Sequence, residues 1–167
     1  MIVAIDVGYN ENNIAKAVCV GFHDWADEKA ITIVEEFVIG LEPYQPGEFY
    51  KRELPCILKV LQKVEMRFVN AVIVDGYVYL DDTGKPGLGY YLYEALGRKI
   101  PVIGVAKTNF HDNTKNVIEV VRRDSNKPLF VTSIGIEVEV AAENIKKMHG
   151  AFRLPTLLKK ADTISRR

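Results

Sequence analysis

Short apolar runs separated by polar turns make up the first forty residues. The apolar positions over residues 2–7, 15–22 and 30–39 predict three strands, and the short turns between them predict an antiparallel meander. A stretch with helical spacing follows over residues 49–68 and leads to a fourth apolar run over residues 71–75. A helical connection of this length predicts a right-handed crossover, which places the fourth strand parallel to the first.

Helical and strand patterns alternate in the rest of the chain. We expect helices over residues 88–96 and 137–148, and strands over residues 101–106, 117–121 and 129–132. Three antiparallel strands followed by alternating helices and strands indicate an α/β domain with a mixed sheet. The chain has 167 residues, no repeat and no linker. It is therefore predicted to form a single domain over residues 1–167.

Acidic residues stand at the ends of two of the predicted buried strands. Asp6 follows the apolar run 2–5, and Asp75 follows the apolar run 71–74. Open α/β sheets bind their ligands beyond the carboxyl ends of the strands, and neighbouring strands would bring these two carboxylates together. Two carboxylates in a partly dry site repel unless a proton or a cation separates them, and Mg²⁺ prefers oxygen ligands of this kind. The pair therefore favours a metal site.

Two further acids are predicted to turn inward from helices. Glu53 lies one turn before Ile57, at the edge of the apolar stripe, and a glutamate that faces the sheet needs a partner. Asp162 lies four residues after Leu158, on the apolar side of the C-terminal segment. For each acid taken alone, a helix cap or a solvated surface charge is the alternative interpretation.

An ordered series of short motifs resembles the endonuclease V family across nearly the whole chain. The interval from the Pro-Tyr-x-Pro-Gly motif to Arg-Glu is especially specific, and so is Gly-Val-Ala-Lys after a strand. A single match could arise by chance, whereas the ordered set indicates membership. The motifs are Asp6–Tyr9, Pro43–Gly47 with Arg52-Glu53 behind it, Asp75-Gly76, Gly104–Lys107, Phe130–Gly135 and Phe152–Pro155.

The resemblance implies a ribonuclease H-like fold with helices on both faces of the sheet. It also implies Mg²⁺-dependent nicking of DNA on the 3′ side of deaminated bases, chiefly hypoxanthine, in DNA repair; RNA is the alternative partner and Mn²⁺ the alternative ion. The family positions assign the metal to Asp6, Glu53 and Asp75, with Asp162 at a position that is His or Asp in the family. All four acids, together with Lys107, are then the predicted catalytic residues.

The same resemblance implies where the substrate binds. Pro43, Tyr44, Gln45 and Pro46 match the wedge that enters the strand at the lesion, and Gly76 lies by the base pocket. Family members usually continue after Asp-Gly with Gly and then His-Pro-Arg, whereas this chain has an unrelated stretch over residues 77–86. This departure motivates two alternatives: a non-catalytic nucleic-acid-binding protein of the same fold, and a nuclease with another target such as inosine RNA, branched DNA or plain single strands.

Charge and composition change the picture in one respect. The chain has 22 basic and 22 acidic residues. Nucleic-acid binding must therefore depend on local basic clusters rather than on an overall positive charge. No apolar run is long enough to span a membrane and no leader-like segment is present, so we expect a cytoplasmic protein. We also expect the protein to be a monomer. Cys19 and Cys56 lie in apolar patterns and are expected to be reduced core residues.

Overall fold

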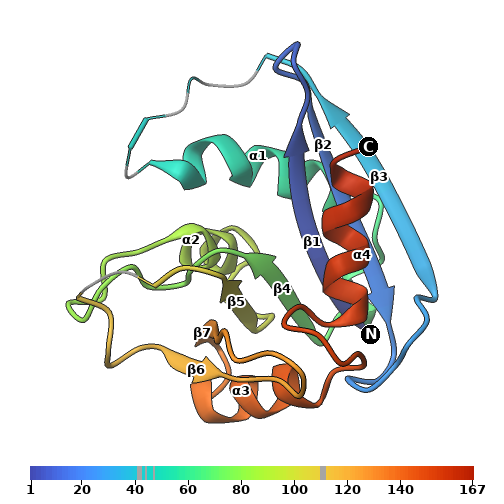
Figure 1. Cartoon of the computed structure of the whole chain (residues 1–167). Helices are drawn as coiled ribbons and strands as arrows, with labels where there is room; N and C mark the ends of the chain where they lie inside the picture. Colours follow the sequence, from blue (N-terminus) through green and yellow to red (C-terminus); the bar gives the residue numbers. More distant parts are fainter. Residues whose placement is uncertain (41–42, 44, 47, 110–111) are drawn as a thin grey trace.

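A mixed seven-stranded sheet forms the centre of the molecule in the computed structural model, which describes residues 1–40, 43, 45–46, 48–109 and 112–167 (Figure 1). The strands lie in the order β3-β2-β1-β4-β5-β7-β6. Strands β1 (Ile2–Tyr9), β2 (Ala15–Phe22) and β3 (Thr32–Val38) form the predicted antiparallel meander. Short polar turns join them, as the alternation of apolar runs and turns requires.

The centre of the sheet is parallel. Strand β4 (Ala71–Asp75) pairs in parallel with β1, and β5 (Val102–Ala106) pairs in parallel with β4. The predicted parallel placement of the fourth strand beside the first is thereby confirmed. Strand β7 (Leu129–Ile134) returns antiparallel to β5, and the edge strand β6 (Ile118–Val120) pairs antiparallel with β7.

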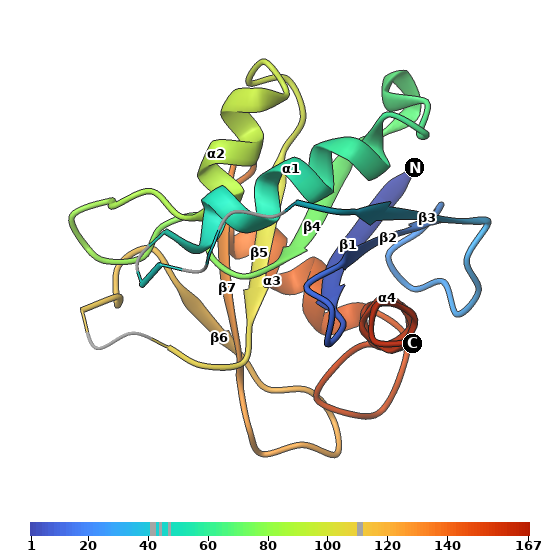
Figure 2. The same cartoon turned by 90° about the horizontal axis from the view of Figure 1, so that it is seen from above.

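The four α-helices of the described residues cover the two faces of the sheet (Figure 2). One apolar layer packs beneath α1 (Phe49–Leu61) and α2 (Leu88–Ala95), and a second packs beneath α3 (Val138–Lys147) and α4 (Thr156–Ser165). The helices on both faces confirm the predicted fold class. In the part of the chain that the structure describes, no helix is long and apolar enough to cross a membrane.

The predicted helix over residues 49–68 is wrong at its carboxyl end. Helix α1 ends at Leu61, and a separate short 3-10 turn, η1 (Met66–Phe68), follows it. The Phe68 side chain is 58% exposed, so it does not extend the buried stripe of α1. The chain must turn here to enter β4, and helical spacing of apolar residues does not by itself show where such a turn falls. The two cysteines, Cys19 and Cys56, are free and buried as predicted.

Candidate active site at the carboxyl ends of the central strands

The parallel strands bring three predicted site residues to one edge of the sheet. The register pairs Ile5 with Val74, so Asp6 and Asp75 come next on neighbouring strands. Asp75 in turn pairs with Val105 of β5, and Lys107 is the first residue after the end of β5. Tertiary structure therefore places Asp6, Asp75 and Lys107 together, as the strand pattern predicted.

Asp6 and Asp75 interact strongly. Their side chains lie within hydrogen-bonding reach of each other. Burial raises the pKa of Asp6 from 3.8 to about 6; Ser165 opposes this shift by hydrogen bonding, and the charges of Asp75 and Asp162 add to it. The Asp75 side chain is exposed at the mouth of the site but has protein on most sides, so burial raises its pKa too, while Lys107 opposes the shift. The two carboxyls resist carrying two negative charges at once.

Glu53 completes this acidic group from the opposite layer. It is only 6% exposed, and helix α1 directs it at the sheet as the apolar stripe predicted. Burial, followed by the charges of Asp6 and Asp75, raises its pKa from 4.5 to about 9. Its carboxyl accepts a hydrogen bond from the hydroxyl of Tyr9, the last residue of β1. The Arg52 guanidinium lies 4.2 Å from the centre of the same tyrosine ring.

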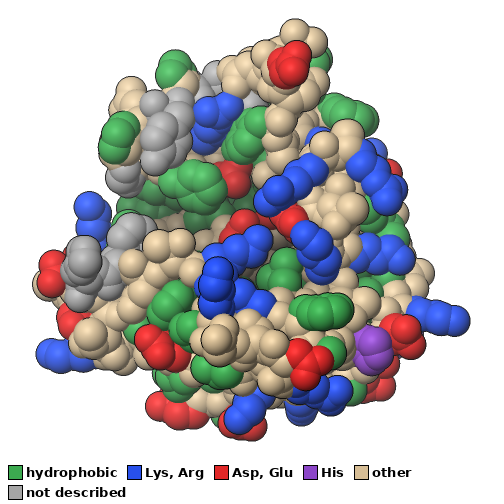
Figure 3. All heavy atoms as spheres, viewed as in Figure 1, with side chains coloured by type: hydrophobic (Ala, Val, Ile, Leu, Met, Phe, Trp, Pro, Cys, Tyr) green, Lys and Arg blue, Asp and Glu red, His purple; other side chains and the backbone are tan. Residues whose placement is uncertain are grey.

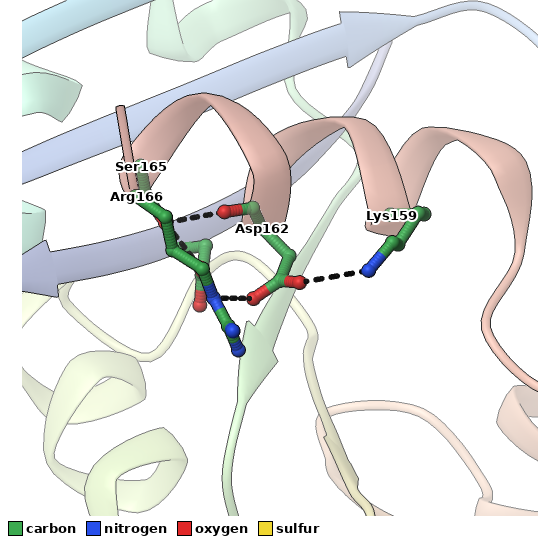
Figure 4. Close-up of polar contacts among 5 residues, drawn as sticks. Lys159, Asp162, Ser165 and Arg166 are labelled. Carbon is green, nitrogen blue, oxygen red and sulfur yellow. Dashed lines mark hydrogen bonds and ion pairs between the residues drawn. The ribbon is translucent and has the colours of Figure 1, made fainter.

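Asp162 lies at the site but is already held by cations of its own helix. It is 8% exposed, which confirms that it faces inward from α4. Its two carboxylate oxygens accept from Arg166 Nε at 2.9 Å and from Lys159 Nζ at 3.4 Å (Figure 4). The spacings i−3 and i+4 put these partners on the same helical face. Asp162 is therefore the one acid of the four whose charge is neutralised within its own helix.

Ser165 ties α4 to the acidic pair. Its hydroxyl lies 2.6 Å from Asp6 Oδ2 and 2.9 Å from the Asp162 carbonyl oxygen. A hydroxyl has one proton, and the charged carboxylate is the stronger acceptor. The close contact depends on Gly8, because a Cβ there would lie 2.2 Å from the Ser165 carbonyl oxygen. The glycine therefore allows α4 to approach β1 closely enough for the hydrogen bond.

Replacing Ser165 with alanine is expected to raise the pKa of Asp6 further. The lost hydrogen bond to a charged group is worth about 1.5–3 kcal/mol, and it favours the ionised form. Carboxyl titration followed by NMR would measure the change. Ser133→Ala is the matched control, since the Ser133 hydroxyl donates to the Ile136 carbonyl at 2.7 Å, outside this acidic group. An unchanged Asp6 titration in Ser165→Ala would contradict this role.

Two cavities meet at the acidic group. The first, here called the carboxylate cavity, has a volume of about 40 Å³ and is lined by Asp6, Asp75, Lys107, Leu154 and Asp162 among others. The second, here called the tyrosine cavity, has a volume of about 770 Å³, which is in the size range of sites for small organic groups. Asp75 and Lys107 line both, so the two cavities adjoin.

The tyrosine cavity has mostly apolar walls, with Asp75 and Lys107 where it meets the carboxylate cavity and further charged side chains at Asp81, Lys85 and Asp112. Its lining includes Tyr50 from the start of α1, and Tyr77 and Leu80 from the loop after β4. Gly76, at φ +143°, lets the chain leave β4 in a direction that other residues rarely adopt. On this face of the molecule, acidic side chains lie in a hollow near the centre, with Lys and Arg side chains around them (Figure 3).

The predicted substrate-binding residues are only partly brought to this cavity. Gly76 lines it. Pro43 and Gln45 line a different cavity, which shares Tyr50 with the tyrosine cavity, and Pro46 lies in a turn before α1. Tyr44 falls outside the described residues.

The acidic group suits a hard divalent cation in its chemistry. Burial raises the pKa values of Asp6, Glu53 and Asp75, and in each case the charge of another acid of the group adds to the shift, so a cation among them would relieve the repulsion that protons otherwise relieve. The side chains of Asp6, Glu53 and Asp162 are instead directed to hydrogen-bond donors of the protein. Among the residues that the structure describes, no three His, Cys, Asp or Glu side chains are placed to hold one ion together. The carboxylate oxygens suit Mg²⁺. Three of these acids can coordinate one ion only after their side chains rotate away from the hydrogen-bond donors that now hold them.

Sequence reasoning missed several residues of this site. Ser165 and Arg166 follow Asp162 by three and four residues, and that spacing could have placed them on one helical face. Tyr9 was part of a motif, but nothing in its neighbourhood showed that its hydroxyl would reach Glu53, 44 residues away. Such contacts depend on how the helices pack on the sheet.

Comparison with known proteins gives a consistent result. A family model described as endonuclease V matches residues 1–163. Solved structures with the same fold include human endonuclease V, with a TM-score of 0.76 and 20% identity over 98% of this chain and 82% of that chain. Endonuclease V from Ciona intestinalis, solved with a 24mer DNA that contains an inosine followed by a ribo-adenosine, has a TM-score of 0.77 and 19% identity over 98% and 83% of the two chains.

The endonuclease V structure from Bacillus subtilis is similar to the same degree. It has a TM-score of 0.75 and 21% identity over 98% of this chain and 77% of that chain. At these identities the structural matches concern the fold, and they show that it is ribonuclease H-like. A search of the curated proteins gives no match.

Proposed function

Because this chain belongs to the endonuclease V family of endodeoxyribonucleases, we propose that it is a Mg²⁺-dependent endonuclease that nicks DNA on the 3′ side of deaminated bases, chiefly hypoxanthine. One observation carries the proposal: the acidic group adjoins a cavity of about 770 Å³ with tyrosine and leucine walls, and Lys107 lines the boundary. A nuclease that acts beside a flipped base needs this combination of charge and apolar space.

The acidic residues would hold the cation. Asp6 and Asp75 supply oxygens from neighbouring strand ends, and Glu53 supplies a third from the opposite layer. Asp162 would join them by releasing Arg166 or Lys159. A bound Mg²⁺ polarises the phosphate and favours deprotonation of water. The protein's own part is to bring these carboxyls to one edge of the sheet, and Ser165 favours the ionised form of Asp6 by donating to it.

The tyrosine cavity would take the base. Its walls include Tyr50, whose partly exposed ring can stack on a base, and the buried Tyr77, whose hydroxyl is engaged with the Thr108 carbonyl oxygen. That hydrogen bond to the loop after β5 stabilises the wall against which the base would lie. Tyr44 is proposed, on its motif alone, to fill the space that the flipped base leaves.

The test is cleavage of matched oligonucleotides. DNA and RNA strands with and without hypoxanthine would be incubated with the protein in the presence and absence of Mg²⁺, and the ends of any products mapped. We expect Mg²⁺-dependent cleavage of the hypoxanthine strand at the second phosphodiester bond on the 3′ side, with 3′-hydroxyl and 5′-phosphate ends. Cleavage irrespective of hypoxanthine would instead support a nuclease with another target, and binding without cleavage would support a non-catalytic protein.

Lys107→Ala is expected to slow cleavage by on the order of a hundredfold, because a cation at the reacting phosphate stabilises developing charge. The same change should reduce the salt dependence of DNA binding by about one phosphate contact. Rates and affinities measured over a series of salt concentrations would show both effects. Lys29→Ala serves as the control, since Lys29 is an exposed lysine in the loop between β2 and β3, which the site does not involve. If Lys107→Ala behaved like Lys29→Ala, Lys107 would be an ordinary surface lysine.

A further inference from the structure

A basic groove adjoins the carboxylate cavity. It has a volume of about 600 Å³, and none of the described residues that line it is acidic. Lys107 lines all three spaces. Leu154 lines the groove and the carboxylate cavity, and Asp75 lines the carboxylate cavity and the tyrosine cavity. The carboxylate cavity therefore adjoins both larger spaces. The lining of the basic groove includes Lys107, Lys127, Phe152, Arg153, Thr156 and Lys159.

An aromatic side chain stands open to water in this groove. Phe152 is 75% exposed, the second most exposed large hydrophobic side chain of the described residues. Exposing a phenylalanine to this degree forgoes the free energy of burying its ring, about 1.5–3 kcal/mol. Cations beside an exposed aromatic ring are the combination with which proteins bind single-stranded nucleic acid, since the cations contact phosphates and the ring stacks on a base.

The loop that carries Phe152 is held rigidly by a buried cation. Arg122 is 1% exposed, and its guanidinium donates to the carbonyl oxygens of Met148, Gly150 and Phe152. Burying a guanidinium is costly unless it is well paired. Burial lowers the pKa of the Arg122 guanidinium. Three hydrogen bonds from one side chain to one loop fix its backbone, so the Phe152 ring is presented from a defined position.

Arg153 fixes the other wall of the groove. Its guanidinium donates to the Pro128 carbonyl oxygen at 2.7 Å and to the Lys107 carbonyl oxygen at 2.5 Å. It thereby joins the Phe152 loop to the chain segments that carry Lys127 and Lys107. The groove also contains Thr156, the first residue of α4, where the positive end of the helix dipole favours an anion.

We propose that the basic groove binds the nucleic-acid strand on the 3′ side of the cleaved bond, with Lys127 at a backbone phosphate and Phe152 stacked on a base. The polarity rests on the proposed function, because a lesion in the tyrosine cavity and a cut on its 3′ side put the continuing strand beyond the carboxylates. The groove binds an unpaired or unwound strand, since stacking on Phe152 requires an open base face.

The experiment compares strands with different flanks. Single-stranded DNA containing hypoxanthine would be prepared with a long or a short 3′ flank, the short one ending at the expected cut, and in parallel with a long or a short 5′ flank. Binding would be measured by fluorescence anisotropy in EDTA, where no metal-dependent cleavage occurs. The variants are Phe152→Ala, Phe152→Trp and Lys127→Ala, and the controls are Phe68→Ala, an exposed phenylalanine on η1, and Lys29→Ala.

We expect Phe152→Ala to lose about tenfold in affinity for the strand with a long 3′ flank, and to match the wild type on the short one. Phe152→Trp should retain wild-type affinity because it keeps a stacking face. Lys127→Ala should lower the salt slope by about 0.7 on the long 3′ flank only. The two control variants should bind all strands as the wild type does.

Other outcomes overturn the assignment or separate it from the proposed function. Equal affinities of Phe152→Ala and wild type on the long 3′ flank, equal losses on both 3′ flanks, or a loss that follows the 5′ flank would each overturn it. A wild-type protein that binds no strand would overturn both proposals. If the protein fails to cleave hypoxanthine strands in Mg²⁺ but Phe152→Ala still loses affinity with the 3′ flank, the groove assignment stands and the proposed target is wrong.

Discussion

Asp75→Asn is expected to reduce cleavage by about a thousandfold while leaving the protein folded. The substitution removes a negative charge from the centre of the acidic group, and a loss of roughly 4 kcal/mol of electrostatic stabilisation corresponds to that factor. The amide keeps the size of the carboxyl, so the packing at the end of β4 is preserved. Single-turnover cleavage of the hypoxanthine strand in Mg²⁺ would measure the effect.

The stability of the same variant distinguishes a functional acid from a structural one. Without a metal ion, the negative charge of Asp75 raises the pKa of Glu53, so removing that charge relieves repulsion. Asp75→Asn should therefore unfold at the same temperature as the wild type or a higher one in EDTA. Asp24→Asn is the control, because Asp24 is exposed and follows β2 at the opposite edge of the sheet. A variant that cleaves at the wild-type rate, or that unfolds at a lower temperature, would argue against the assignment.

Glu53 is expected to make the metal-free protein less stable as pH rises. A carboxyl whose pKa is higher in the folded state than in the unfolded state binds more protons when folded. Its contribution to stability is therefore greatest below the unfolded-state pKa and is lost as pH rises to the folded-state value. For Glu53 that interval runs from 4.5 to about 9, and for Asp6 from 3.8 to about 6. The loss attributable to Glu53 is on the order of 5 kcal/mol across its interval.

Comparison with Glu53→Gln isolates this effect. The glutamine has no charge to bury, so the unfolding free energy of wild type minus that of the variant should fall between pH 5 and pH 9 in EDTA. Denaturant titrations at several pH values would measure the difference. Glu11→Gln, at an exposed turn position, should give a difference that does not change with pH. A pH-independent difference for Glu53→Gln would show that this carboxyl is not strained by its neighbours.

Mg²⁺ should reverse the trend. A cation binds the ionised carboxylates and not the protonated ones, so its stabilising effect on the folded protein grows with pH. The rise in unfolding temperature on adding Mg²⁺ should therefore be larger at pH 9 than at pH 6, and much reduced in Glu53→Gln.

The sequence by itself determined the local elements and the identity of the acids. Strands β2 and β4 have the bounds that their apolar runs predicted, because the spacing of apolar residues decides which face of a segment is buried. The same spacing placed Glu53 and Asp162 on inward faces, and both are buried. Strand connectivity then predicted that Asp6 and Asp75 would be neighbours, because a crossover of this kind has one favoured hand.

Only the tertiary structure decided what those residues contact. Ser165 reaches Asp6 across 159 positions of the chain, and Arg122 holds a loop that begins 26 positions away. No local pattern encodes such pairs, because each depends on how closely a helix approaches a strand, as at Gly8. The end of α1 at Leu61 was likewise set by the path into β4. Periodicity shows which side of an element is buried, whereas the partner found there depends on the packing of the whole sheet.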